Sequence, residues 1–292
     1  MSNLDGLHKI ASVSASLGES PVWDANKNLL YFVDIAAGKI NRLLSQGVVE
    51  TIYQSTRSVG ALALTDKGNL IFTEDASVAL FNVERGEKDR NTTPVYTATG
   101  YRFNDGACDP QGRFVTGLMG ADPQLNAGAL YRYSSILKPQ LIHQNMALPN
   151  GLAWSEDDRT LFFVDSATCS IFQANYSPDG EMGTVTLFAR TPAELGRPDG
   201  IALDKAGGLW VCQFNGACLL YYNSNGQLSA NIPMPVPRPT SCCFGGKGLE
   251  TLFITTARFA MTPPELARYP DAGDLYAIRP GIAGIPRHLF RE

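Results

Sequence analysis

Residues 148–165 read LPNGLAWSEDDRTLFFVD: a Pro-Asn-Gly turn signal, a short apolar strand, a polar turn and a second apolar strand. The chain repeats this pattern with different residues. Clear copies are GESPVWDANKNLLYFVD at 18–34, FNDGACDPQGRFV at 103–115 and RPDGIALDKAGGLWV at 197–211. Two weaker copies begin at Val59 and Pro239. Six copies of one supersecondary unit indicate a repeat architecture.

One residue of each copy falls in register, four places before the end of the first strand. The spacings between these register residues are 41, 44, 46, 49 and 41 residues. A period of this length has room for about four short strands, which is typical of a β-propeller blade. We therefore predict an all-β, six-bladed β-propeller whose register residues surround one central channel. They are Glu19, Gly60, Asn104, Asn150, Asp199 and Thr240.

The copies use nearly the whole chain, so the sequence predicts a single propeller domain over 1–292. The loosely alternating segment 7–14 is expected to pair with the last copy, because closure removes exposed sheet edges. The polar stretch 84–93 is interpreted as an outer loop, and 261–272 as an insertion with one helical turn near 263–268 that could act as a lid. A two-domain β-sandwich protein is the alternative, but it does not predict six phrases in register. The predicted copies span 15–55, 56–96, 97–145, 146–190, 191–236 and 237–292.

Composition narrows the classes of function. The net charge is −4, and no Lys/Arg cluster with interleaved aromatic residues occurs, so neither nucleic acid nor an anionic membrane is an expected partner. The six cysteines show neither metal-binding spacing nor a disulfide-framework pattern. No apolar run is long enough to cross a membrane, and the N-terminal segment does not resemble a signal peptide. The sequence therefore predicts a cytoplasmic protein; its oligomeric state is left open.

Four of the six register residues offer oxygen ligands. Glu19, Asn104, Asn150 and Asp199 would face one another around the axis, and their two charges and two amides suit a hard divalent cation. The alternative is that Asn-Gly, Asp-Gly and similar pairs only form turns. Glu19 argues against it, because Glu is a poor turn residue. Converging carboxylates would also repel each other without a cation. We expect one divalent cation, Ca²⁺ first, with Zn²⁺, Mn²⁺ and Mg²⁺ as alternatives.

Several other polar residues could have either a functional or a purely structural role. Arg102 lies two residues before Asn104, so both side chains should point to the same side of an extended segment. It could hold a hydroxyl-rich or anionic substrate, or pair with a neighbouring carboxylate. Asp122 could belong to a lid or to a surface Asp-Pro turn. Asp34, Glu74 and Asp165 end the second strands of their copies, where capping of the strand end is the favoured interpretation.

Familiar catalytic motifs are missing from the sequence. It contains no G-x-S-x-G elbow, no H-E-x-x-H motif and no P-loop. The three histidines lie outside the repeated phrases, so covalent catalysis by a Ser or Cys has little support. The catalytic mechanism that remains is attack by water with the assistance of a metal.

At these motifs the sequence resembles the SMP-30/gluconolactonase/luciferin-regenerating enzyme family over almost its whole length. The resemblance rests on GESPVW at 18–23, RFNDG at 102–106, PNGLAW at 149–154 and PDG at 198–200. It implies a six-bladed propeller with one divalent cation in the channel, held by Glu19, Asn150 and Asp199. It also implies substrate contacts from Arg102 and Asn104, with Asp199 as general base. A lid Glu of the family falls on Asp122, which is one methylene shorter.

Members of the family that resemble this sequence hydrolyse sugar lactones to aldonic acids, and the resemblance implies the same activity here, on aldono-1,4- or 1,5-lactones. A metal-dependent phosphotriesterase or other esterase is the alternative within enzymes. A non-catalytic propeller that binds a protein partner is the alternative from another class. Because the distinctive polar residues are expected in the channel rather than at the rim, the sequence favours an enzyme.

Overall fold

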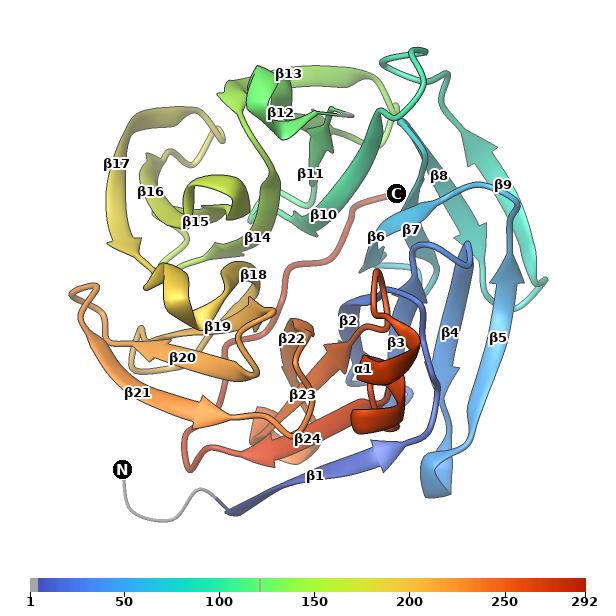
Figure 1. The fold of residues 1–292 in the computed structure, drawn as a ribbon. Helices are drawn as coiled ribbons and strands as arrows, with labels where there is room; N and C mark the ends of the chain where they lie inside the picture. The colour runs from blue at the N-terminus through green and yellow to red at the C-terminus, as the bar shows by residue number, and fades with distance from the viewer. Residues whose placement is uncertain (1–4, 121) are drawn as a thin grey trace.

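The computed structural model describes residues 5–120 and 122–292 as six four-stranded antiparallel sheets arranged around a central axis (Figure 1). The predicted six-bladed all-β propeller is confirmed. Residues 1–4 of the predicted domain, and Ala121 of the copy-three insertion, lie outside the described residues. The first five blades are β2–β5 (Gly18–Asp24, Leu29–Asp34, Lys39–Leu43, Val49–Gln54), β6–β9 (Val59–Leu64, Leu70–Glu74, Ser77–Asn82, Glu87–Asn91), β10–β13 (Arg102–Cys108, Phe114–Met119, Gly128–Tyr133, Pro139–Met146), β14–β17 (Pro149–Trp154, Thr160–Asp165, Ser170–Tyr176, Met182–Arg190) and β18–β21 (Arg197–Leu203, Leu209–Phe214, Cys218–Tyr222, Leu228–Pro233).

The sixth blade joins the two ends of the chain. It consists of β22 (Pro239–Gly245), β23 (Thr251–Thr256), β24 (Leu275–Arg279) and, as its outer strand, β1 (Asp5–Ala11). β1 pairs antiparallel with β24, with His8 opposite Ala277. The loop between β23 and β24 carries α1 (Pro263–Arg268), a single helical turn where the sequence indicated one; a Thr262–Glu265 capping box begins it.

The interpretation of 84–93 as an outer loop was wrong. Glu87–Asn91 forms β9, the outermost strand of the second blade, and pairs with β8. All five of its residues are exposed. With both faces in water, the strand shows none of the polar–apolar alternation by which a half-buried strand is recognised.

The capping interpretation of the strand-end carboxylates is confirmed for Asp34 and Asp165. Asp34 accepts backbone N–H bonds from Ser16 at 2.8 Å and Leu17 at 3.0 Å. Asp165 accepts equivalent bonds from Ala147 and Leu148. Each carboxylate thus fixes the segment that leads into the innermost strand of its own blade. Those segments precede Glu19 and Asn150.

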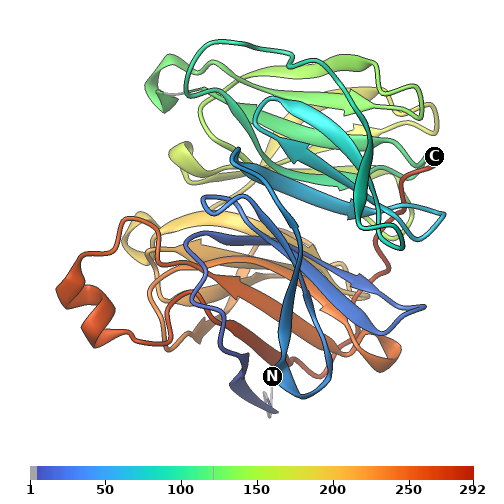
Figure 2. The same ribbon diagram turned by 90° about the vertical axis from the view of Figure 1, so that its right-hand side faces the viewer.

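The core lies between neighbouring sheets. The largest fully buried side chains are mostly aromatic, and hydrophobic clusters join residues of neighbouring blades. Figure 2 shows the sheets side by side in a second view. All six cysteines are free, and five of them are buried. No helix of the described residues is long and apolar enough to cross a membrane.

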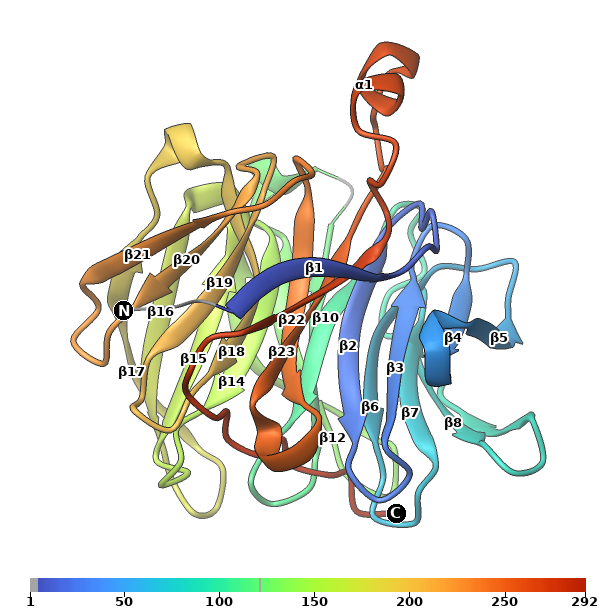
Figure 3. The ribbon, with the colours of Figure 1, turned by 90° about the horizontal axis from the view of Figure 1, so that it is seen from below.

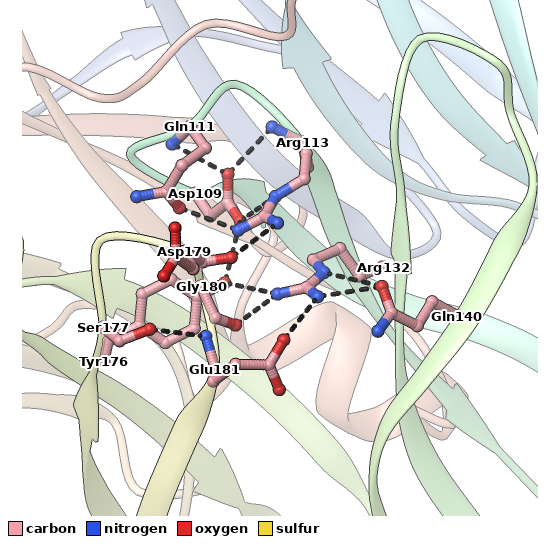
Figure 4. A network of polar contacts seen from close by, with 10 residues as sticks. All are labelled: Asp109, Gln111, Arg113, Arg132, Gln140, Tyr176, Ser177, Asp179, Gly180 and Glu181. Carbon is pink, nitrogen blue, oxygen red and sulfur yellow. Dashed lines mark hydrogen bonds and ion pairs between the residues drawn. The ribbon is translucent and has the colours of Figure 1, made fainter.

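A buried polar network links the third and fourth blades (Figure 4). Asp109, which is fully buried, accepts bonds from the Arg113 side chain at 2.8 Å and from the Tyr176 hydroxyl at 2.8 Å. Arg113 also donates to the carbonyl of Asp179, and Arg132 donates to the carbonyl of Gly180. The β16–β17 turn is therefore tied to its neighbour by charged hydrogen bonds, which fix one blade relative to the next.

The segment after β24 crosses the centre of the propeller, on the face opposite α1 (Figures 1 and 3). We call residues 284–292 the C-terminal tail. It forms bridges through Gly284, His288 and Phe290 to residues at the end of the first strands of the fifth, third and second blades, or one residue beyond that end. Arg287 donates to the carbonyl of Cys242 in the sixth blade at 3.0 Å. The sixth predicted copy, 237–292, included this segment, but nothing in the repeat pattern indicated that it would leave its own blade and contact three others.

Phe290→Ala is expected to lower the free energy of unfolding by about 3–5 kcal/mol, because the ring is fully buried and its removal leaves a cavity. Leu289, next to it, is 42% exposed, so Leu289→Ala is the matched control and should cost much less. Urea unfolding of both variants measures the difference. Equal losses would show that the tail does not pack into the core as described.

Candidate metal and substrate site

The innermost strands of all six blades are irregular at the same place. Each of β2, β6, β10, β14, β18 and β22 has a register shift against its neighbour, and the shift begins at or one residue before the register residue. Such bulges bend a strand and redirect its side chains. At Gly60 the backbone passes so close to the third blade that a Cβ would lie 2.3 Å from the Phe103 carbonyl oxygen, so that position can carry no side chain.

Four of the register residues meet at a single cavity of about 190 Å³. Glu19, Asn150 and Asp199 are only 5%, 4% and 6% exposed, and Asn104 lies beside them. Thr240, by contrast, bonds to the Gly18 carbonyl and to Thr255 and does not line the cavity. The lining residues are Leu17, Glu19, Arg102, Asn104, Met119, Leu148, Asn150, Ser166, Arg197, Asp199, Phe214 and Phe259.

Asn150 and Asp199 are in direct contact. The Asn150 amide donates to Asp199 Oδ1 and to the Ser166 hydroxyl, while its Oδ1 accepts the Gly151 N–H at 3.1 Å. The two ends of a carboxamide are interchangeable by rotation, so Asn150 can present its oxygen to a cation in place of its NH₂. Within the part of the chain that the structure describes, Glu19 accepts a single hydrogen bond, from the N–H of Ser20 at 3.1 Å.

Arg102 and Asn104 also lie together. Arg102 donates to Asn104 Oδ1 at 2.7 Å and to the Phe103 carbonyl, both from Nη1. Asn104 donates to the Pro149 carbonyl at 3.1 Å. Among the described residues Arg102 has no carboxylate partner, so the alternative of a simple ion pair does not hold. Arg102 lines the same cavity as the carboxylates of Glu19 and Asp199.

Asp122 is not brought to the cavity. Its side chain is exposed and accepts the N–H of Gln124 at 2.9 Å, which caps the 3₁₀ turn Pro123–Leu125. This is the Asp-Pro turn that the sequence offered as the alternative. A substrate contact from Asp122 stays a prediction that depends on movement of this loop.

Burial and mutual repulsion act on the carboxylates of the site. Burial, followed by the charges of Asp199 and Asp105, holds the pKa of Glu19 well above its usual range. Burial and the charge of Asp105 do the same to the pKa of Asp199. Burial lowers the pKa of Arg102 to about 10. Within the described residues neither Glu19 nor Asp199 has an ion-pair partner, so the site lacks positive charge in close contact.

These observations fit a divalent cation. No group of three His, Cys, Asp or Glu side chains among residues 5–120 and 122–292 is placed to hold a metal, so the oxygen of Asn150 would have to complete the ligand set. Two carboxylates and one carboxamide are oxygen donors of the type that hard cations prefer. Buried carboxylates left unpaired are costly, and a cation would remove that cost.

Two further polar residues of this region were missed in the sequence. Asp105 is buried behind the site; it accepts bonds from Ser20 and Gly106, and burial raises its pKa, which the charge of Arg287 partly offsets. Arg197 lines the cavity two residues before Asp199. That is the spacing that singled out Arg102, so the signal for Arg197 was present in the sequence.

Asp199→Asn is expected to stabilise the metal-free protein at neutral pH. The native pKa values of Glu19 and Asp199 are raised, so the native state keeps protons that the unfolded chain releases, and stability falls as the pH rises above about 4. Each unit by which a pKa is raised costs about 1.4 kcal/mol. Urea unfolding with a chelator at about pH 5 and pH 7 should show a shallower fall for the variant than for the wild type. Asp179→Asn, at an exposed carboxylate, should behave as wild type; parallel pH profiles of all three proteins would contradict the prediction.

The chain is similar in sequence to proteins of known activity. The family model described as the SMP-30/gluconolactonase/LRE-like region matches residues 17–258. The chain belongs to this family. It is 34% identical over 278 residues to 6-deoxy-6-sulfogluconolactonase of Pseudomonas putida, covering 94% of each chain. It is 31% identical over 289 residues to L-arabinolactonase of Azospirillum brasilense, covering 96% of this chain and 94% of that one.

The fold agrees with these relationships. A solved structure of regucalcin from Agrobacterium tumefaciens, described as a calcium-binding protein, superposes with a TM-score of 0.89 at 21% identity. The match covers 99% of this chain and 98% of that one. The resemblance seen in the sequence motifs is thus confirmed at the level of the family and the fold.

Proposed function

We propose that the protein is a metal-dependent hydrolase that opens sugar lactones to aldonic acids. One observation carries the proposal: the three oxygen-donating residues Glu19, Asn150 and Asp199 share a single cavity with the hydrogen-bond donors Arg102 and Asn104. The names of two relatives, a sulfogluconolactonase and an arabinolactonase, support the same substrate class.

A divalent cation held by Glu19, Asn150 and Asp199, with Ca²⁺ as the first expectation and Zn²⁺, Mn²⁺ and Mg²⁺ as alternatives, would polarise the lactone carbonyl and stabilise the charge that develops on its oxygen. The calcium-binding description of the regucalcin structure supports this order. The protein's own groups do the rest of the chemistry.

Asp199 is the proposed general base. Its carboxylate lines the cavity, and a carboxylate positioned beside a reacting water can accept its proton. Asp199 takes a proton from water as the water oxygen bonds to the carbonyl carbon. The bond between that carbon and the ring oxygen then breaks, the proton passes to the ring oxygen, and the products are a carboxylic acid and a free hydroxyl.

Arg102 and Asn104 are the proposed binding residues for the ring hydroxyls. The Arg102 hydrogen bonds to Asn104 and Phe103 hold its guanidinium at the cavity wall, with donors left for a ligand. Met119, Leu148 and Phe259 supply apolar surface on the same wall. A mixture of a few fixed donors and apolar contacts is typical of a small-molecule pocket.

Acid release from a panel of aldonolactones, followed with a pH indicator, tests the proposal. Hydrolysis with Ca²⁺ and its loss with a chelator are expected. A phosphotriester and a simple aryl ester belong in the same panel, because a polarising cation would also act on them. Preference for either one would replace the lactonase by that activity. No hydrolysis of any substrate would leave a non-catalytic propeller.

A further inference from the structure

A second layer of residues stands two places before each register residue, at the start of the innermost strand or one residue before it. Four of its members line the cavity: Leu17, Arg102, Leu148 and Arg197. The other two are Ser58 and Arg238. Three of the six blades therefore carry an arginine in this layer. Arg102 has a place in the proposed function, and the other two do not.

Arg197 is an unpaired cation at the cavity. Its side chain is exposed, it lines the cavity, and among residues 5–120 and 122–292 it has no side-chain hydrogen bond and no ion pair. Its guanidinium carbon lies 5.8 Å from the centre of the Phe214 ring, which also lines the cavity. A cation–π contact restricts the side chain and leaves its five N–H donors available.

Arg238 lies over the same ring. Its guanidinium carbon is 5.5 Å from the Phe214 centre, and it is fixed by bonds to Asn215 Oδ1, at 2.6 Å, and to the Phe259 carbonyl. Two cations on one ring repel each other, and in the described part of the chain neither has a carboxylate at ion-pair distance. An anion at the mouth of the cavity would relieve this repulsion.

The net charge of the site also favours an anionic ligand. The lining residues Glu19 and Asp199 are balanced by Arg102 and Arg197. The divalent cation of the proposed function would therefore leave the cavity positively charged. A neutral lactone makes no use of that charge, whereas a substrate with a fixed negative group does.

We propose that Arg197 binds an anionic group on the exocyclic end of the lactone, so that the preferred substrates are sugar lactones with a terminal sulfonate, phosphate or carboxylate. Arg197 is then a specificity-determining residue. This inference rests on the proposed function, because that function places the lactone ring in the cavity. The anion subsite itself consists of residues other than the proposed metal ligands and hydroxyl-binding residues.

The test compares gluconolactone with the same lactone carrying a phosphate, a sulfonate or a carboxylate at its terminal carbon. Full-length wild type, Arg197→Leu, Arg197→Lys and Arg159→Leu are assayed at low ionic strength. Arg159 is the matched control, because it is also an exposed arginine but lies in the β14–β15 turn, outside the site cavity. Calorimetry with the ring-opened acids, charged and uncharged at that carbon, measures binding independently of turnover.

Arg197→Leu should lower kcat/KM for the anionic lactones about tenfold or more, mainly through KM, and leave gluconolactone within about twofold. Arg197→Lys should retain part of the preference, salt should weaken it, and Arg159→Leu should have no effect. The kcat/KM values of the three anionic lactones show whether the subsite prefers a phosphate, a sulfonate or a carboxylate.

Equal losses on charged and neutral lactones, or a wild type that does not prefer charged ones, would overturn the inference while the lactonase survives. If no lactone is hydrolysed, the proposed function fails. The calorimetry then decides the inference: tighter binding of the terminally charged acid by wild type but not by Arg197→Leu upholds it, and equal binding overturns it.

Discussion

Asp199→Ala is expected to reduce kcat at least about a hundredfold through the loss of the general base alone, and further through the loss of a metal ligand. The fold should remain, because Asp199 carries a buried charge whose repulsion with Asp105 and Glu19 the substitution removes. Stopped-flow or indicator assays on the best lactone measure the loss, with circular dichroism to monitor folding.

A second variant separates the two roles of Asp199. Asp199→Asn keeps an oxygen beside Asn150 but cannot accept a proton from water, so cation binding should suffer less than turnover. Asp179→Ala, at an exposed turn, is the control that should retain full activity. A folded Asp199→Ala protein with near wild-type turnover would refute the assignment of the base.

Removing the cation is expected to abolish activity and lower stability together. A ligand that binds only the native state stabilises it by about 2.7 kcal/mol at one hundred times its Kd. The gain should be large because Glu19 and Asp199 have no other ion-pair partner in the described residues. Thermal unfolding with increasing Ca²⁺, and with each alternative divalent cation, measures it against a chelator.

Two variants test whether the cation stabilises the protein by binding at this site. Glu19→Gln should reduce the shift in Tm caused by the cation, whereas Asp122→Asn should leave it unchanged, because Asp122 lies outside the cavity. A Tm that responds to no divalent cation would contradict the assignment of Glu19, Asn150 and Asp199 as ligands. Equal responses of both variants and the wild type would place the cation elsewhere in the protein.

The repeat made most of the architecture predictable. Register positions such as Glu19 and Asp199 could be found because the same phrase recurs at nearly even spacing, and repetition places equivalent residues around one axis. The bulges at those positions could not be predicted, because Glu-Ser-Pro and Asn-Asp-Gly share no local signal for them. β9 was missed since its side chains are polar on both faces.

The site was predictable where copies could be compared with one another. Arg197 shares its spacing with Arg102, but the argument was applied to only one of the two copies. Asp105 adjoins a register residue and was read as part of a turn. Phe214 and Phe259 come from a second strand and from a loop outside the repeat, so only the three-dimensional structure brings them to the cavity wall.

The pairing of β1 with β24 in the sixth blade has a consequence for folding during synthesis. β1 is synthesised about 270 residues before its partner β24, and the C-terminal tail follows β24. Until β24 is made, β1 has no partner strand, and pairing across so much chain is slow. The sixth blade therefore cannot form until β24 is translated, and up to that point the exposed edge of β1 is open to pairing with other chains, which favours aggregation.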